Sequence, residues 1–155
     1  MTYEEVLENA KKTMAPKCKV CPECNGIACK GQVPGAGGVK SGRAFTVCRD
    51  FLKSVYVNMD TIHEEKEIDT SIEFLGHKFD VPFFIAPIGG MAFNYTNYLD
   101  ESEYSKAVVF GARACNTLAF TGDGPDDSFF LATLPIIKEA DGIAISTIKP
   151  WEYDK

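Results

Sequence analysis

The stretch Val81–Met91, with the sequence VPFFIAPIGGM, constrains the fold of this chain more than any other. Its short run of apolar, β-branched and aromatic residues is typical of a strand buried on both faces, as strands of a parallel sheet are. Gly89 and Gly90 end the run, and glycine lets the backbone approach another group closely. Ligands bind at the carboxyl ends of parallel strands in α/β proteins. The stretch therefore predicts either a ligand-binding edge or a tight turn after a buried strand.

Two further apolar runs follow, and a helical pattern precedes each of them. The runs are TLAFT at 117–121 and IAISTI at 143–148. The predicted order is therefore strand, helix, strand, helix, strand, and each connection is long enough for a right-handed crossover. We predict an α/β fold with a parallel sheet. The pattern of residues leaves a barrel and an open doubly wound sheet as alternatives.

Side chains that cap or break helices mark the predicted helix boundaries. The starting residues are the capping-box pairs Thr2 with Glu5 and Asp100 with Glu103, then Ser41, and Asp126 or Asp127. Pro16 ends the first helix, and Pro135 breaks or kinks the last one. The segment 71–79, SIEFLGHKF, is predicted to be a hairpin that turns near Gly76.

Three strands cannot bury both of their faces in a stable two-layer domain. We therefore expect either a piece of a larger α/β protein or a chain that assembles with another. Residues 1–60 are predicted to form a helical, cysteine-rich N-terminal segment, and residues 61–155 hold the hairpin and three strand–helix units. The predicted helix after Ser41 has an apolar face, made up of Ala44, Val47, Cys48, Phe51, Leu52 and Val55. Cys48 and Cys115 lie on such helix faces and are predicted core residues.

Composition and charge argue against several classes of protein. The 155 residues suffice for one domain with a core, and 45% hydrophobic with 25% charged content is that of a globular protein. The net charge of −6 disfavours general nucleic-acid binding. The N-terminus lacks the apolar region of a signal peptide, and no apolar run approaches the ~20 residues of a membrane span. We therefore expect a cytoplasmic protein with reduced cysteines that binds neither nucleic acid nor membrane.

Four of the six cysteines lie close together in the sequence. They are separated by two, two and four residues and are Cys18, Cys21, Cys24 and Cys29. Thiolates at such spacings can converge on one soft cation, and the C-x2-C-x2-C part is similar to ferredoxin-type ligation of a four-iron cluster. The last spacing differs from that of ferredoxins, and structural zinc sites usually draw their ligand pairs from farther apart. An iron–sulfur cluster, a zinc site and four reduced thiols in a packed loop are the alternatives.

The glycine-rich loop and four other polar side chains give weaker indications of a functional site. The glycine-rich loop at 31–42, GQVPGAGGVKSG, has valine where a phosphate-binding loop needs glycine before its Lys-Ser pair. His63 and His77 lie in polar segments and are predicted surface residues. Asp123 and Lys149 lie at or just past the ends of predicted parallel strands, where a functional role and a solvated charge are both open.

A series of motifs between Gly35 and Trp151 resembles a known family. In chain order they are PGAGG, SGRAF at the start of a helix, TSIEFLGHKFDVP, FFIAPIGGM and the helix SEYSKAVVFGARACNT. In this order they resemble the FMN-dependent α-hydroxy-acid oxidase and dehydrogenase family, which includes glycolate and lactate oxidases. The Ile-Ala-Pro at the end of the first strand is the best single marker. The resemblance implies the first part of a (β/α)8 TIM barrel, with about three parallel strands after the N-terminal segment.

The resemblance also implies which residues contact the cofactor. Backbone along the end of the first strand would pass the flavin ring, and the ends of the next two strands would lie near it. The implied FMN-binding residues are Ala86, Pro87, Ile88, Gly89, Thr121, Gly122 and Thr147.

Some positions depart from the family. Ser146 or Thr147 stands where the family has a glutamine that touches the flavin. Lys149 falls near a family tyrosine that touches the substrate, and Gly31 and Gln32 replace another substrate-binding tyrosine. Because these family positions touch the flavin and the substrate, the departures concern which substrate is bound and whether it is a hydroxy acid.

In the family, the histidine base, the carboxylate-binding arginine and the flavin-facing lysine come from later strands, so the resemblance implies no catalytic residue in this chain. The implied function is the N-terminal part of an FMN enzyme that oxidises a 2-hydroxy acid to a 2-oxo acid and is incomplete as a catalyst by itself. The remaining barrel residues or a second chain would complete the fold, and the complete enzyme is expected to form homo-oligomers. The alternatives are a type 2 isopentenyl diphosphate isomerase, also an FMN barrel, and an iron–sulfur or zinc-binding module for electron transfer or interaction.

Overall fold

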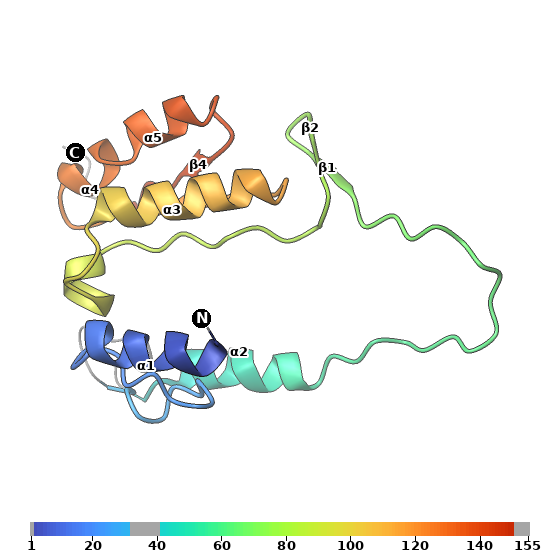
Figure 1. The fold of residues 1–155 in the computed structure, drawn as a ribbon, viewed down its shortest axis with the longest axis horizontal. Coiled ribbons are helices and arrows are strands. Elements are labelled where there is room, and N and C mark those ends of the chain that lie inside the picture. Colours follow the sequence, from blue (N-terminus) through green and yellow to red (C-terminus); the bar gives the residue numbers. More distant parts are fainter. Residues whose placement is uncertain (1, 32–40, 151–155) are drawn as a thin grey trace. The chain divides into compact units, whose positions relative to one another are not determined.

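A computed structural model describes residues 2–31 and 41–150 of the chain (Figure 1). The chain divides into an N-terminal unit, residues 1–67 with 93–98, and a C-terminal unit, residues 68–92 with 99–155. The Pro/Gly-rich stretch PGAGG and Trp151 lie outside the described residues. No helix in the described ranges combines the length and the apolar character that crossing a membrane requires.

The first helix of the N-terminal unit, α1 (Tyr3–Met14), begins at the predicted capping box. The Thr2 N–H donates to Glu5 Oε2 at 2.8 Å, and the Glu5 N–H donates to Thr2 Oγ1 at 3.3 Å. These two bonds satisfy donors that a helix start otherwise leaves without partners. The helix ends before Pro16, as predicted.

The second helix, α2 (Arg43–Lys53), begins differently from the prediction. Ser41 was expected to be its N-cap, but the N-cap is Gly42, which has a φ of 64° and makes no side-chain cap. The Ser41 hydroxyl instead accepts from the Arg43 N–H, the first residue of the helix, at 3.4 Å. Glycine adopts the left-handed conformation at little cost, so the chain enters the helix one residue later than expected.

The apolar face of α2 is exposed. Phe51 is 66% and Leu52 70% exposed, and Cys48 is exposed as well, so the prediction that Cys48 is a core residue is wrong. Among the described residues of the N-terminal unit no apolar side chain is buried. A helical pattern predicts the helix and its apolar face, but burial of that face needs a surface that covers it.

The C-terminal unit begins with an antiparallel hairpin of β1 (Ile72–Phe74) and β2 (His77–Phe79). Leu75 and Gly76 connect the strands with φ values of 50° and 78°. Two successive left-handed residues are characteristic of the type I′ turn, whose twist matches that of the flanking strands. The predicted turn near Gly76 is therefore confirmed.

Leu75→Asn is expected to raise the free energy of unfolding of the C-terminal unit by about 0.5 to 1 kcal/mol, because asparagine tolerates a positive φ better than leucine does. Leu75 is 71% exposed, so the substitution removes little apolar burial. Equilibrium urea denaturation measures the change. Leu75→Val is the matched control, and its β-branched side chain is expected to destabilise the turn. An asparagine variant no more stable than the valine variant would contradict the assignment of the turn.

Three parallel segments lie side by side after the hairpin. The first contains Ile85, whose N–H donates to Leu118 O at 2.9 Å and whose carbonyl accepts from the Phe120 N–H at 3.0 Å. The second is β3 (Phe120–Thr121), and it pairs in parallel with the third, β4 (Ile145–Ser146). The predicted parallel order is confirmed, and the unit is α/β. The strands are short, and the described residues form no closed barrel.

The connections between the parallel segments are helical. A π-helix at Met91–Tyr95 and α3 (Glu101–Ala114) follow the first segment, and α4 (Asp127–Leu131) and α5 (Leu134–Glu139) follow the second. The predicted starts at Asp100 and Asp126 are both confirmed, because each side chain caps its helix. Pro135 lies in the first turn of α5 and separates it from α4. Proline has no N–H to continue a helix, but it fits a first turn.

The core of the C-terminal unit lies between its helices and its parallel strands. Figure 1 shows α3 and α5 next to each other over β4, and their small and branched side chains form one cluster. The buried members are Val109, Ala112, Ala119, Ile136, Ala140 and Ala144. Alanine at several of these positions lets helix and sheet backbones approach closely, since its side chain is a single methyl group.

The stretch Val81–Met91 is less buried than predicted. Phe83 is 68% exposed, and only Gly90 and Met91 at its end are buried, so the expectation of a strand buried on both faces is wrong. In the described part of the chain this stretch makes one β-bridge, at Ile85. Two prolines in the stretch have no N–H to extend the ladder.

Candidate functional site

The parallel strands bring three predicted cofactor segments to one edge. The first segment ends at Ile88 and Gly89. Gly122 and Asp123 follow the end of β3, and Thr147 follows the end of β4. Strand register places them together, since Ile85 pairs with Ala119 and the next strand pairs in parallel beyond it. This is the edge at which parallel α/β folds bind ligands.

Backbone contact between the first two strand ends explains their glycines. A Cβ on Gly122 would lie 2.2 Å from the carbonyl oxygen of Ile88 and 2.4 Å from the nitrogen of Gly89. A Cβ on Gly89 would lie 2.8 Å from the carbonyl oxygen of Asp123. Side chains do not fit at such distances, so each glycine allows the two chain segments to touch. The close approach expected at Gly89 is therefore to the neighbouring strand end.

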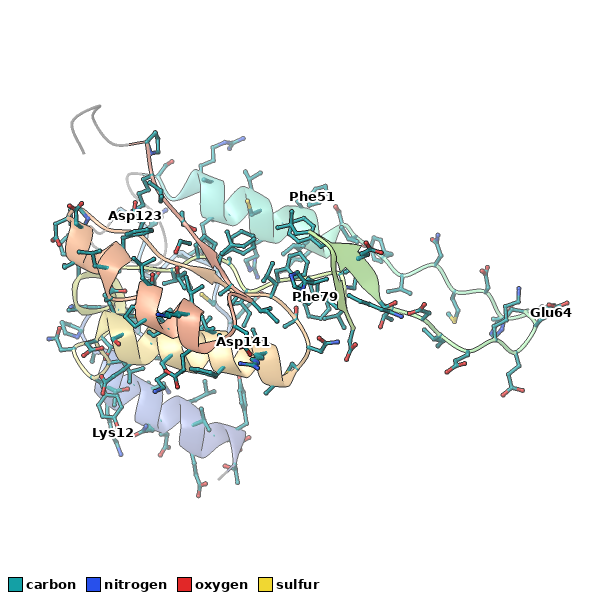
Figure 2. The ribbon with its side chains drawn as sticks, turned by 90° about the horizontal axis from the view of Figure 1, so that it is seen from above. Lys12, Phe51, Glu64, Phe79, Asp123 and Asp141 are labelled. Atoms are coloured by element: carbon teal, nitrogen blue, oxygen red, sulfur yellow. The ribbon has the colours of Figure 1, made fainter. Side chains whose placement is uncertain are left out.

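Asp123 ties the end of β3 to the chain after β4. Its side chain is buried, with Oδ2 accepting from the Lys149 N–H at 2.8 Å and Oδ1 accepting from the Gly124 N–H at 2.8 Å. The ammonium of Lys149 donates to the Asp123 carbonyl oxygen at 3.1 Å. Figure 2 labels Asp123 at this end of the unit, away from the hairpin that carries Phe79. A carboxylate that accepts two backbone N–H groups holds these loops in place.

Thr121 has its hydroxyl engaged on the helix side of the sheet. Its Oγ1 lies 3.4 Å from Oγ1 of Thr133, which is 1% exposed, and its carbonyl accepts from the Thr147 N–H at 3.2 Å. Next to this pair, Ser146 Oγ is buried and has no hydrogen-bond partner in the described residues. Thr121, a predicted FMN contact, is therefore the last residue of β3 with its hydroxyl bonded to Thr133, and Gly122 follows directly after the strand.

The end of the first segment offers an accessible apolar surface. Ala86 and Pro87 are exposed, and Ile88 and Gly89 are half-buried. Flavin rings are flat and largely apolar, and cofactor sites are lined mainly by apolar groups with a few polar ones. The residues at this edge therefore fit the ring of FMN in polarity.

Glu101 is a residue that sequence reasoning missed. Its Oε1 accepts from the Met91 N–H at 2.6 Å, and Met91 is buried directly after the glycine pair. The contact holds the chain leaving the first strand against the start of α3. Acidic residues are favourable in the first turn of any helix. Glu101 at such a position therefore does not indicate this particular bond in the sequence.

Neither histidine is among the residues that form the carboxyl edge. His77 is exposed, and with Phe79, Leu118 and Ile145 it lines a cavity of about 110 Å³ at the opposite, amino ends of the strands. His63 is also exposed, and its Nδ1 lies 3.0 Å from the carbonyl of Glu64. Both are surface residues, as predicted, and His77 lies away from the carboxyl edge of its own unit.

Two other carboxylates have lowered pKa values. Hydrogen bonds from the hydroxyl and the N–H of Ser71 lower the pKa of Asp69, which precedes the hairpin. A hydrogen bond from its own backbone N–H, followed by one with Thr2, lowers the pKa of Glu4 at the start of α1. Both groups stabilise local backbone structure.

The cysteines are all free. Three of the four clustered ones, Cys18, Cys21 and Cys29, are half-buried, and Cys24 is exposed. In the described ranges no group of three or more histidine, cysteine or acidic side chains is arranged to hold a metal ion. Cys115 is exposed at the C-cap of α3, so its predicted place in the core is wrong.

Comparison with known proteins identifies the family. Residues 35–119 match the family model of the FMN-dependent dehydrogenases. No curated protein and no solved structure matches the chain significantly. The matched residues run from the glycine-rich stretch through the first parallel segment and α3 to the start of β3. Because they make up more than half of the chain, this protein belongs to the FMN-dependent dehydrogenase family, whose members are oxidoreductases that use FMN.

Proposed function

We propose that this chain supplies the first three strand–helix units of an FMN-dependent barrel enzyme that oxidises a 2-hydroxy acid to a 2-oxo acid. The observation that carries the proposal is the shared carboxyl edge of three parallel segments in a chain of this family. Barrel enzymes place their cofactors and substrates at that edge.

The backbone of residues 86–89 would hold one side of the flavin ring, with Gly122 and Thr147 near it. Ala86 and Pro87 present small apolar groups there, which favour contact with an aromatic ring over contact with water. When bound there, FMN would supply the acceptor for the hydride equivalent that the substrate loses. The strand ends would orient the ring and exclude water from one of its faces.

Lys149 is the proposed substrate contact. Its ammonium lies at the same edge, 3.1 Å from the carbonyl of Asp123, and its side chain is exposed. A 2-hydroxy acid carries a carboxylate, and a cation near the flavin attracts that group. His77 is not proposed as the base that takes the hydroxyl proton, because it lies at the opposite ends of the strands.

Further strands would cover the apolar surface that this unit exposes. Phe83 is 68% and Ile148 70% exposed, and both belong to parallel segments. Parallel sheets are normally covered on both faces, so the unit presents surface suited to additional strands and helices, from the same polypeptide or from a second copy. Those elements would also bring the base.

Titration of the purified chain with FMN is expected to give weak but saturable quenching of flavin fluorescence. Pro87→Asp should weaken binding at least tenfold, about 1.4 kcal/mol, because it puts a charge against the proposed ring face. Pro125→Asp, at an exposed loop position, is the matched control and should bind as the parent does. Equal binding by both variants would place the flavin elsewhere.

The proposed reaction is tested by adding 2-hydroxy acids anaerobically to the FMN-loaded chain and following the oxidised-flavin absorbance. We expect no bleaching by this polypeptide alone, and bleaching once the remaining strand–helix units of an FMN-dependent dehydrogenase are joined to it. Lys149→Met in that fusion should raise KM more than it lowers kcat. Robust turnover by the unjoined chain would overturn the claim of incompleteness. Isomerisation of isopentenyl diphosphate by the fusion would instead favour the isomerase alternative.

A further inference from the structure

The described part of the N-terminal unit contains no hydrophobic core. The buried residues among its described part are Gly26, Gly42 and Thr96, and α1 and α2 contain no buried residue. A unit of this size that buries so little apolar surface normally needs a disulfide, a metal or a partner to hold its structure. All six cysteines of the chain are free thiols.

The thiols that could supply such a link lie in one closed loop. Lys19 Nζ donates to the carbonyl of Ala28 at 3.1 Å, which joins the residue after Cys18 to the residue before Cys29. The contact therefore links the two ends of the loop, next to its first and last cysteines. The Val20 N–H donates to Cys18 Sγ at 3.4 Å. Backbone N–H groups that point at sulfur stabilise thiolates and are a feature of metal–thiolate sites.

The loop is also fixed to α2. Gly26 is buried with a φ of 73°, and a Cβ there would lie 2.5 Å from the ring of Phe45. Glu23, between the second and third cysteines, forms ion pairs with Arg49 and, at 3.3 Å, with Lys53. The backbone that carries the cysteines is therefore packed against a helix, which lowers the entropy cost of gathering their side chains.

We propose that Cys18, Cys21, Cys24 and Cys29 bind one soft metal centre that holds the N-terminal unit together. The ligand chemistry is four thiolates, which suits a zinc ion or an iron–sulfur cluster. Each thiol that binds loses a proton to solvent as its sulfur bonds to a zinc ion or to a cluster that is already assembled, and neither step transfers an electron. The four sulfurs do not form a ready coordination sphere among the described residues, and structural thiolate sites assemble as the metal binds. This proposal is independent of the one for FMN.

The test uses the full chain, purified anaerobically, with metal analysis and absorbance. We expect either about one zinc per chain with no visible band, or iron and sulfide with broad brown absorbance. Changing the four clustered cysteines to serine should remove this metal to background. Cys48→Ser and Cys115→Ser, at exposed positions outside the loop, should retain it.

A second measurement separates loss of a ligand from loss of the fold. In the parent chain, the four clustered thiols should resist alkylation until a chelator is added, while Cys48 and Cys115 react at once. Chelation should unfold the N-terminal unit, and added Zn²⁺ or cluster reconstitution should restore it. Metal retained by the four-serine variant would overturn the proposal. So would a parent chain that carries no metal, takes up neither zinc nor a cluster on reconstitution, and alkylates all six cysteines equally.

Discussion

Gly122→Ala is expected to lower the free energy of unfolding of the C-terminal unit by about 3 kcal/mol, at the upper end of the usual cost of overpacking. The added methyl group would lie 2.2 Å from the carbonyl oxygen of Ile88 and 2.3 Å from its carbonyl carbon. Both are backbone atoms, so no side chain can rotate away to make room. The strand ends must separate to make room for the methyl group. FMN binding should weaken as a result, because the strand ends form the proposed binding edge. Equilibrium urea denaturation and flavin fluorescence measure the two effects.

Gly111→Ala is the matched control for this substitution. Gly111 is exposed on α3, and a Cβ there would meet nothing within 4 Å. Alanine is favoured over glycine inside a helix by about 1 kcal/mol, so this variant should be more stable than the parent. Equal stability of the two alanine variants would show that the strand ends are not in contact.

Asp123→Ala is expected to destabilise the same unit by about 3 kcal/mol, since hydrogen bonds to a charged group contribute about 1.5 kcal/mol or more each. The backbone N–H groups of Lys149 and Gly124 would lose their acceptor in a buried place. Asp123→Asn should cost less, because its amide oxygen replaces one of the two acceptors. Urea denaturation at constant pH ranks the parent and the two variants by their free energy of unfolding.

Lys149→Met separates the two kinds of contact with Asp123. The variant keeps the backbone N–H that donates to the carboxylate and loses the ammonium contact of an exposed side chain with the Asp123 carbonyl. We expect a change below about 1 kcal/mol, as for most exposed charged contacts. A loss as large as that of Asp123→Ala would mean that the ammonium, rather than the backbone, is the main partner of Asp123.

Together these variants test whether the carboxyl edge is a rigid platform. Gly122 and Asp123 lie in the same loop, and each fixes it to a different neighbour, Ile88 on one side and Lys149 on the other. Loops that position a cofactor need such support, because a displaced strand end changes the geometry of binding. FMN affinity should therefore fall in both destabilised variants and stay constant in Gly111→Ala.

Local features of the chain were predictable from sequence. The capping boxes at Thr2 and Asp100 are formed as expected, and the helix break at Pro135 and the turn at Gly76 are also present. Each depends on residues within three or four positions of one another. Short-range hydrogen bonds and the fixed φ of proline determine such features whatever surrounds them.

Burial was predicted less well. The apolar face of α2, with Phe51 and Leu52, was identified correctly as a face but is exposed, and Phe83 is exposed in a strand that was expected to be covered. Periodicity indicates which side chains share a face. It contains no information about whether a second surface covers that face.

The sequence alone determined the order of strands and helices. That order also defined the parallel edge, with its segments 86–89, 121–123 and 147–149. Only the tertiary structure decided what those residues touch. Gly122 meets Ile88 and the Asp123 carboxylate accepts from Lys149, 26 residues away, because parallel pairing brings distant strand ends together. Contacts of this range follow from register and crossover geometry, which no local pattern of residues encodes.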